Sequence, residues 1–181
     1  MRIILVRHGE TNQNIEALPL TEKGIIQAKL LANELKNYSF DEVYSSDLLR
    51  AKQTCEIFTK DYIEDKRLRE IYRVLIGGPI KEGTPEEREF LSKERAESFF
   101  QDLLKRNKDV LIFCHGNLIR YYINKVFNSK ENLWQSVVIN NCSISILDFK
   151  EDLLRLIKLN STAHLEEEIK FDLENVENYL P

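Results

Sequence analysis

Two histidines of this chain, each followed by glycine, stand at the ends of apolar runs. His8-Gly9 comes after residues 3–6 and one arginine, and His115-Gly116 comes directly after residues 110–114. Short apolar runs of this kind predict buried strands, so both histidines should lie in loops that lead from a strand into a helix. Ligands of an open parallel sheet bind outside the carboxyl ends of its strands, and the two imidazoles can therefore converge on one pocket. Glycine after each histidine lets the backbone approach a bound group closely.

Two arginines near these histidines indicate an anionic ligand. Arg7 precedes the first histidine, and Arg50 falls in the first turn of a helix predicted after a strand at 42–44. The free N–H groups and positive dipole end of a helix start, together with two guanidinium groups, make a site suited to a dianionic phosphate. We therefore expect sulfate or phosphate to bind here without a metal ion or another cofactor.

The elements that must position these residues alternate between strand and helix. Apolar or β-rich runs at 3–6, 42–44 and 110–114 are each followed by a helical pattern, which is typical of βα units around a largely parallel sheet. The sequence thus predicts an α/β fold of three layers, with a mostly parallel central sheet flanked by helices. No repeat or interdomain linker interrupts residues 1–181, so we expect a single domain.

Capping residues mark where the helices should begin. Thr21 and Ser46 each precede an apolar stripe at helical spacing, and both can act as N-caps. The clearest start is Thr84-Pro85-Glu86-Glu87, a capping box with proline at the first helical position, which opens a helix to about Arg106. Further elements are predicted as a helix at 118–127 and strands at 137–149 and 153–159.

The composition is that of an ordinary soluble globule, with 43% apolar and 31% charged residues. No apolar run reaches the length of a membrane span, and the short apolar start of the chain is not that of a signal peptide. Cys55, Cys114 and Cys142 form no Cys-x-x-Cys pair. This pattern argues against a disulfide framework or a structural zinc site and fits a reducing cytoplasm.

The formal net charge of −4 is concentrated near the end of the sequence. Residues 165–181 carry six acids and one lysine, so nucleic-acid binding gets no support and the rest of the chain need not repel an anionic substrate. Apolar residues at helical spacing in the same segment predict a C-terminal helix at about 165–180. This helix should dock on its own domain, with a contact in a homodimer or with another partner as the alternative.

Several motifs occur in the order found in one known family. The motifs are Arg7-His8-Gly9-Glu10-Thr11, Asn14, Leu20-Thr21-Glu22-Lys23-Gly24, residues 45–54, Leu68-Arg69-Glu70 and His115-Gly116, followed later by Ala163-His164-Leu165. With these motifs the chain resembles the histidine phosphatase superfamily of phosphoglycerate mutase-like enzymes over residues 1 to about 127. Each motif alone is weak, but the ordered set is highly specific.

The resemblance implies a phosphohistidine mechanism, which the residue types support on physical grounds. His8 would attack phosphorus through a ring nitrogen while Arg7, Arg50 and His115 neutralise charge on the phosphoryl oxygens. Only a neutral imidazole can attack, and the neighbouring arginines favour the neutral form.

A carboxylic acid must protonate the leaving alkoxide and later take a proton from the attacking water. Glu70 follows Leu68-Arg69 much as the family's acid follows a leucine, and we assign this role to Glu70. Three other glutamates compete for it: Glu10, Glu82 and Glu87.

The resemblance also assigns residues to substrate binding. Asn14 matches an asparagine that donates to the phosphoryl group, although the loop between Asn14 and Leu20 is shorter than the family's usual one. Gly116 and Asn117 lie next to His115 and could line the same pocket. Asn117 could instead cap the following helix.

The short loops favour hydrolysis over mutase-type transfer. A mutase must enclose its intermediate and keep water away from it. Here the segment 71–83 and the loop after Asn14 are both short, so water would be difficult to exclude. We expect a cytoplasmic phosphatase for a small phosphorylated metabolite. The alternatives are phosphoglycerate mutase-type transfer, a protein phosphohistidine phosphatase, and a domain that binds phosphorylated ligands without catalysis. A metal site of His8, His115 and Glu70 is opposed by the adjacent arginines. Three basic residues could recognise a second acidic group of the substrate: Arg69, Arg73 and Lys81.

Overall fold

The computed structural model describes residues 1–12, 18–74, 80–127 and 136–166. These residues include six strands and four α-helices. The strands are β1 Arg2–Arg7, β2 Glu42–Ser45, β3 Ile63–Glu64, β4 Val110–Cys114, β5 Ile144–Lys150 and β6 Leu153–Ser161. The helices are α1 Glu22–Leu35, α2 Leu49–Phe58, α3 Pro85–Arg106 and α4 Gly116–Phe127, with a 3-10 turn, η1, at Lys66–Leu68. The C-terminal helix predicted at about 165–180 lies, after its first two residues, outside the described part of the chain.

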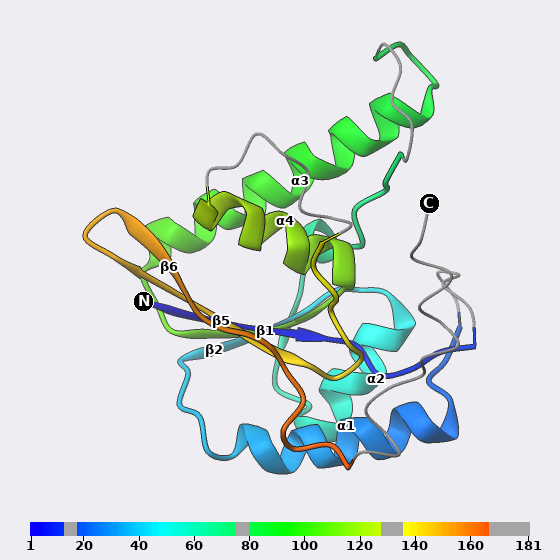
Figure 1. The fold of residues 1–181 in the computed structure, drawn as a ribbon, viewed down its shortest axis with the longest axis vertical. Helices are drawn as coiled ribbons and strands as arrows, with labels where there is room; N and C mark the ends of the chain where they lie inside the picture. The colour runs from blue at the N-terminus through cyan, green and yellow to red at the C-terminus, as the bar shows by residue number, and fades with distance from the viewer. Residues whose placement is uncertain (13–17, 75–79, 128–135, 167–181) are drawn as a thin grey trace.

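The strands form one sheet in the order β3-β2-β4-β1-β5-β6. β3, β2, β4 and β1 are parallel, and β5 and β6 extend the sheet as antiparallel strands. Helices α3 and α4 lie above the sheet in Figure 1, and α1 and α2 lie below it. The predicted three-layer α/β fold with a mostly parallel central sheet is therefore confirmed.

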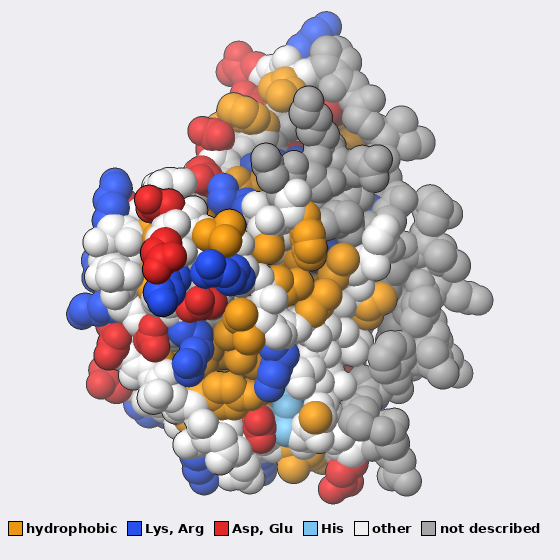
Figure 2. All heavy atoms as spheres, turned by 60° about the vertical axis from the view of Figure 1, so that its left-hand side comes forward, with side chains coloured by type: hydrophobic (Ala, Val, Ile, Leu, Met, Phe, Trp, Pro, Cys, Tyr) orange, Lys and Arg blue, Asp and Glu red, His pale blue; other side chains and the backbone are white. Residues whose placement is uncertain are grey.

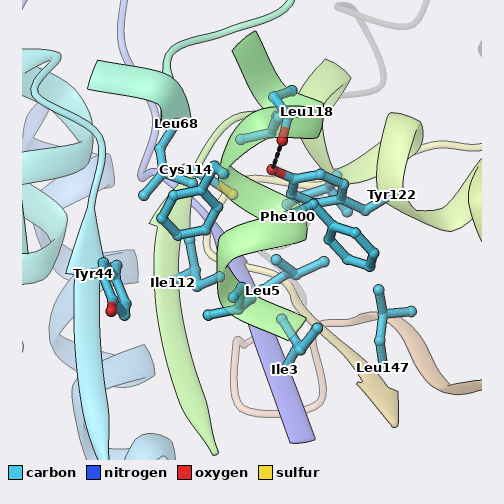
Figure 3. Packing of buried hydrophobic residues seen from close by; sticks show 14 of the residues in the cluster. Ile3, Leu5, Tyr44, Leu68, Phe100, Ile112, Cys114, Leu118, Tyr122 and Leu147 are labelled. Atoms are coloured by element: carbon cyan, nitrogen blue, oxygen red, sulfur yellow. Dashed lines mark hydrogen bonds between the residues drawn. The ribbon is translucent and has the colours of Figure 1, made fainter. Parts of the chain in front are cut away.

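The central strand β1 is buried on both faces, which is why it reads as an unbroken apolar run. Ile3 and Leu5 belong to the core cluster that includes residues of α3 and α4. Ile4 and Val6 point the other way, into the cluster that includes residues of α1. Figure 3 shows the first cluster, in which Phe100 of α3 packs near the side chains of the strands. Packing on both faces fixes the carboxyl end of β1, where His8 follows.

Two of the three predicted helix starts are confirmed. The hydroxyl oxygen of Thr21 accepts a hydrogen bond from the N–H of Gly24 at 2.9 Å, and Thr84 caps α3 in the same way. The prediction that Ser46 caps α2 is wrong, because α2 begins after Leu48 without a side-chain cap. The hydroxyl group of Ser46 is used instead in the candidate site described below.

The strand predicted at 137–149 begins only at Ile144, because the residues before it contact the end of β1. The N–H of Cys142 donates to the carbonyl oxygens of Arg7 at 3.0 Å and His8 at 3.3 Å. The side chain of Asn141 donates to the same carbonyl of His8 at 2.9 Å. Residues 137–143 therefore form a loop over the carboxyl end of β1.

Gly24 brings the start of α1 against the loop after β1. A β-carbon at Gly24 would overlap the carbonyl oxygen of Glu10, and one at Gly9 would lie 2.6 Å from the carbonyl oxygen of Gly24.

We expect Gly24→Ala to lower the free energy of unfolding by about 1–3 kcal/mol through this overlap, although alanine is intrinsically the better helix former. Denaturant unfolding measures the change. Gly116→Ala is the control, because its β-carbon would meet its nearest described atom at 3.4 Å; equal losses in both variants would contradict this account.

Among the described residues, no helix combines the length and the apolar composition that a membrane span requires. The edge strand β6 exposes three apolar side chains, Leu153, Ile157 and Leu159. Figure 2, in which the left-hand side of Figure 1 comes forward, shows apolar side chains among basic and acidic ones on this face. An exposed edge strand can pair with another chain, but the homodimer stays a prediction.

Candidate active site

The two Gly-flanked histidines lie side by side at the carboxyl ends of β1 and β4. These strands are parallel neighbours with Arg7 opposite Cys114, so the next residue of each strand, His8 and His115, falls at the same level. Their ring centroids are 5.2 Å apart, and the N–H of His8 donates to the carbonyl of Cys114 at 3.0 Å. The side chains are 2% and 0% exposed, so each ring is almost completely removed from bulk water.

The hydrogen bonds of His8 define which ring nitrogen can react. Nδ1 lies 2.7 Å from the carbonyl oxygen of Gly9, and because a carbonyl only accepts, Nδ1 carries the proton. Nε2 is then unprotonated and accepts a hydrogen bond from Nε of Arg50 at 3.1 Å. Burial, with help from Arg7 and Arg50, holds the pKa of His8 well below its usual range, so the ring is neutral at pH 7.

The two predicted arginines both reach this end of the sheet. Arg50 is the second residue of α2 and is 3% exposed. Arg7 ends β1, and one of its terminal nitrogens donates to the carbonyl of Ile139 in the loop 137–143. Gly116 lies against the Arg7 side chain, since a β-carbon at Gly116 would come within 3.5 Å of its Nε. The site is thus electropositive, with two guanidinium groups beside neutral imidazoles.

Ser46 orients the second imidazole, a role that the sequence did not suggest. Its buried hydroxyl oxygen accepts a hydrogen bond from the N–H of Leu48 at 3.3 Å and lies 2.9 Å from Nε2 of His115. If the hydroxyl proton is given to Nε2, both groups are satisfied, and Nδ1 of His115 carries the ring proton. Nδ1 is buried and has no hydrogen-bond partner among the described residues. Burial lowers the pKa of His115 well below its usual value, so the ring offers a neutral N–H donor.

The carboxyl group of Glu70 lies against the first turn of α4, the helix that directly follows His115. Its Oε1 accepts hydrogen bonds from the N–H groups of Ile71 and Leu118, each at 3.1 Å. Burial raises the pKa of Glu70, and the positive charge of Arg7 and these two N–H groups only partly oppose the rise. A carboxyl group with a raised pKa is the state that a proton donor needs.

The competing glutamates have other surroundings. Glu10 forms an ion pair with Lys23 at 3.3 Å and accepts a hydrogen bond from Thr21. Glu87 accepts one from the N–H of Gly83 at the start of α3, and Glu82 is exposed. None of these contacts reaches the helix turn after His115, whereas the N–H of Leu118 in that turn donates to Glu70.

Of the two asparagines predicted to bind substrate, the structure describes only Asn117. Asn14 lies outside the described residues. Asn117 is the second residue of α4, so it is not the N-cap. Its amide donates to the carbonyl of Ile71 at 3.3 Å and accepts from Arg120 at 2.9 Å. The side chain of Asn117 thus joins α4 to the segment after Glu70.

Thr54 ties the loop after β1 to α2. Its hydroxyl oxygen accepts from the N–H of Gly9 at 3.0 Å and donates to the carbonyl of Arg50 at 2.7 Å. These two hydrogen bonds fix the loop after β1 relative to α2, and so fix His8 relative to Arg50.

The described residues contain no group of three His, Cys, Asp or Glu side chains that could bind a metal ion.

Comparison with known proteins yields one family. The model of the histidine phosphatase superfamily (branch 1) matches residues 3–162. The uncharacterized phosphatase PhoE of Bacillus subtilis is 28% identical, over 93% of this chain and 98% of its own length. The mitochondrial serine/threonine-protein phosphatase Pgam5 of Caenorhabditis briggsae is 32% identical over 80% of this chain, which spans only 57% of that relative. The crystal structure of a phosphoserine phosphatase mutant from Entamoeba histolytica with phosphoserine has a TM-score of 0.73 at 26% identity, covering 91% of this chain and 99% of that one.

Proposed function

This chain belongs to the histidine phosphatase superfamily, and we propose that it is a phosphatase that hydrolyses a small phosphomonoester through a phosphohistidine intermediate on His8. The observation that carries the proposal is the state of one atom. Nε2 of His8 is unprotonated, buried beside a second imidazole and faced by the guanidinium of Arg50. A lone pair in an electropositive pocket is suited to attack on the phosphorus of a dianionic ester.

In the first half-reaction, Nε2 of His8 forms a bond to phosphorus while the bond from phosphorus to the ester oxygen breaks. Arg7, Arg50 and the Nδ1–H group of His115 hold the other phosphoryl oxygens. As the phosphoryl group enters, its oxygens take over the guanidinium of Arg50 and release the lone pair of His8. Burial raises the pKa of Glu70 and so favours its protonated form, which gives its proton to the leaving oxygen.

In the second half-reaction, water attacks the phosphorus and the carboxylate of Glu70 takes a proton from it. The bond between phosphorus and Nε2 of His8 breaks, and orthophosphate leaves with the original protonation states restored. Neither half-reaction needs a metal ion or another cofactor. Activity that survives a chelator is the expected result.

The known relatives favour two classes of substrate for this enzyme. Similarity to a phosphoserine phosphatase over almost the whole chain supports a small phosphorylated metabolite. The relative named as a serine/threonine-protein phosphatase favours a phosphoprotein as the second candidate. Parallel assays with phosphoserine, a phosphoserine peptide and a phosphohistidine peptide separate these classes. Release of one orthophosphate for each substrate consumed distinguishes hydrolysis from mutase-type transfer.

Replacing Glu70 with glutamine should lower kcat by about 10²-fold, because the amide cannot supply a proton to the leaving oxygen. Steady-state assays with a phosphomonoester measure the effect. Glu10→Gln is the matched control and should keep most of the activity, since Glu10 contacts Lys23 and Thr21 rather than the imidazole pair. An unchanged rate in Glu70→Gln would assign the proton transfer to another group.

The state of the cysteines bears on the compartment in which the enzyme works. The thiols of Cys55, Cys114 and Cys142 are free and buried, which supports a reducing compartment such as the cytoplasm. We propose that residues 1–181 act as one domain on a metabolite, without nucleic acid or membrane as a partner.

A further inference from the structure

Arg95, in the middle of α3, contacts the backbone on both sides of the proposed proton donor. One terminal nitrogen of its guanidinium donates to the carbonyl oxygen of Arg69 at 2.7 Å and to that of Glu70 at 2.9 Å. The carboxyl group of Glu70 is meanwhile held by the N–H groups of Ile71 and Leu118. The residue is therefore fixed at both its main chain and its side chain, by two different helices.

Within the described part of the chain, the charge of Arg95 has no carboxylate at ion-pair distance. Its buried Nε also has no hydrogen-bond partner there. Burial and the nearby charge of Arg69 lower the pKa of Arg95, while the charges of Tyr122, Glu70 and Asp47 oppose this change. Arg95 is half-buried, and a charged side chain withdrawn from water gains from an acidic partner. The acidic group that would gain most from this cation is the carboxylate that Glu70 becomes after it has given up its proton.

A second arginine contact links the same segment to the site. The guanidinium of Arg69 binds both carboxylate oxygens of Asp47, with nitrogen–oxygen distances of 2.8 and 2.6 Å. Asp47 directly follows Ser46, which orients His115. The backbone that Arg95 holds is thus connected to the loop that positions the imidazole pair.

We propose that Arg95 is a positioning residue for catalysis: it fixes the backbone at Glu70 and stabilises the carboxylate form that proton donation produces. This inference rests on the proposed role of Glu70. Arg95 touches neither substrate nor reacting atoms and acts only through Glu70.

The test compares two substrates of similar shape that differ in how much they need an acid, phenyl phosphate and p-nitrophenyl phosphate. Nitrophenolate leaves readily without protonation, whereas phenol, with a pKa of about 10, gains from a proton donor. For Arg95→Met we expect kcat/KM to fall about tenfold or more with phenyl phosphate, but only about twofold with p-nitrophenyl phosphate. Arg95→Lys keeps a cation and one donor, so it should recover part of the loss and remains testable if the methionine variant does not fold.

The pH profile gives a second readout that a purely structural role would not move. Removing a cation near Glu70 should raise the pKa of that carboxyl further. The basic limb of kcat/KM, where the proton donor ionises, should therefore move to higher pH in Arg95→Met and return part of the way in Arg95→Lys.

Arg67→Met is the matched control, because Arg67 also ties the segment before Glu70 to α3, through Asp102 at 2.7 Å. It should leave the difference between the two substrates unchanged. Equal losses on both substrates in Arg95→Met and Arg95→Lys, with the basic limb of the pH profile unmoved, would overturn the role of Arg95.

Glu70→Gln distinguishes a failure of the role proposed for Glu70 from a failure of the role proposed for Arg95. If Glu70→Gln shows the same loss on both substrates, Glu70 is not the acid, and the role of Arg95 falls with it; if Glu70→Gln discriminates and the Arg95 variants do not, only the role of Arg95 is wrong.

Discussion

Replacing His8 with alanine should lower kcat by at least about 10⁴-fold, since removal of a covalent nucleophile leaves only binding and charge stabilisation. The unprotonated Nε2 of His8 carries a lone pair on a nucleophilic nitrogen and faces a guanidinium group. The buried His115 cannot take over, because its Nε2 is engaged by Ser46. Phosphate release from p-nitrophenyl phosphate, followed over hours, has the range to measure such a loss.

His164 provides the control for the His8 substitution. It is the third histidine of the chain and is not part of the pair formed by His8 and His115. Its Nε2 lies 3.0 Å from the carbonyl oxygen of Cys142. His164→Gln retains a donor for that carbonyl and should stay within about threefold of the parent rate. If His8→Ala kept more than a tenth of the parent kcat, His8 would not be the nucleophile.

Replacing Arg50 with methionine should lower kcat/KM by about 10³-fold, because this guanidinium is assigned both to the phosphoryl oxygens and to the charge state of His8. The same change should move the acidic limb of the pH profile. Arg50 is one of the groups that hold the pKa of His8 low, so its loss raises that pKa. A larger fraction of His8 is then protonated and unreactive at a given acidic pH, and the limb shifts to higher pH.

Lys52→Met is the control for this change, as it removes a cation from the same helix. Lys52 forms an ion pair with Glu64 at 2.7 Å on the surface and contacts neither imidazole. Its substitution should change neither kcat/KM nor the position of the limb. An acidic limb that stays in place in Arg50→Met, or moves to lower pH, would contradict the electrostatic account of His8.

The convergence of the histidines could be predicted because it follows from local pattern and sheet topology. The apolar run at 3–6 reads as a strand buried on both faces, and the run at 110–114 reads the same way. Parallel pairing of two such strands places the residues after them at one edge. The two threonine caps depend only on neighbouring N–H groups, so they too were readable from the sequence.

The features that the sequence did not reveal depend on contacts between distant residues. Val137, Val138 and Ile139 have the composition of a strand, but their segment is held by Arg7 and Arg120, whose side chains donate to its carbonyl groups. Ser46 has the spacing of a helix cap, yet its hydroxyl group contacts the imidazole of His115, which follows β4. No local pattern links Arg95 to Glu70, because the contact crosses from α3 to the segment before it in the chain.

The most direct test of the account is to find where the phosphoryl group resides during turnover. The parent enzyme is mixed with a labelled phosphomonoester, quenched in alkali within milliseconds, digested and examined by mass spectrometry and ³¹P NMR. We expect an acid-labile, alkali-stable phosphoryl group on Nε2 of His8, and none in His8→Ala. Label on Nδ1 of His8 or on another residue, or turnover without any label, would contradict the phosphohistidine mechanism.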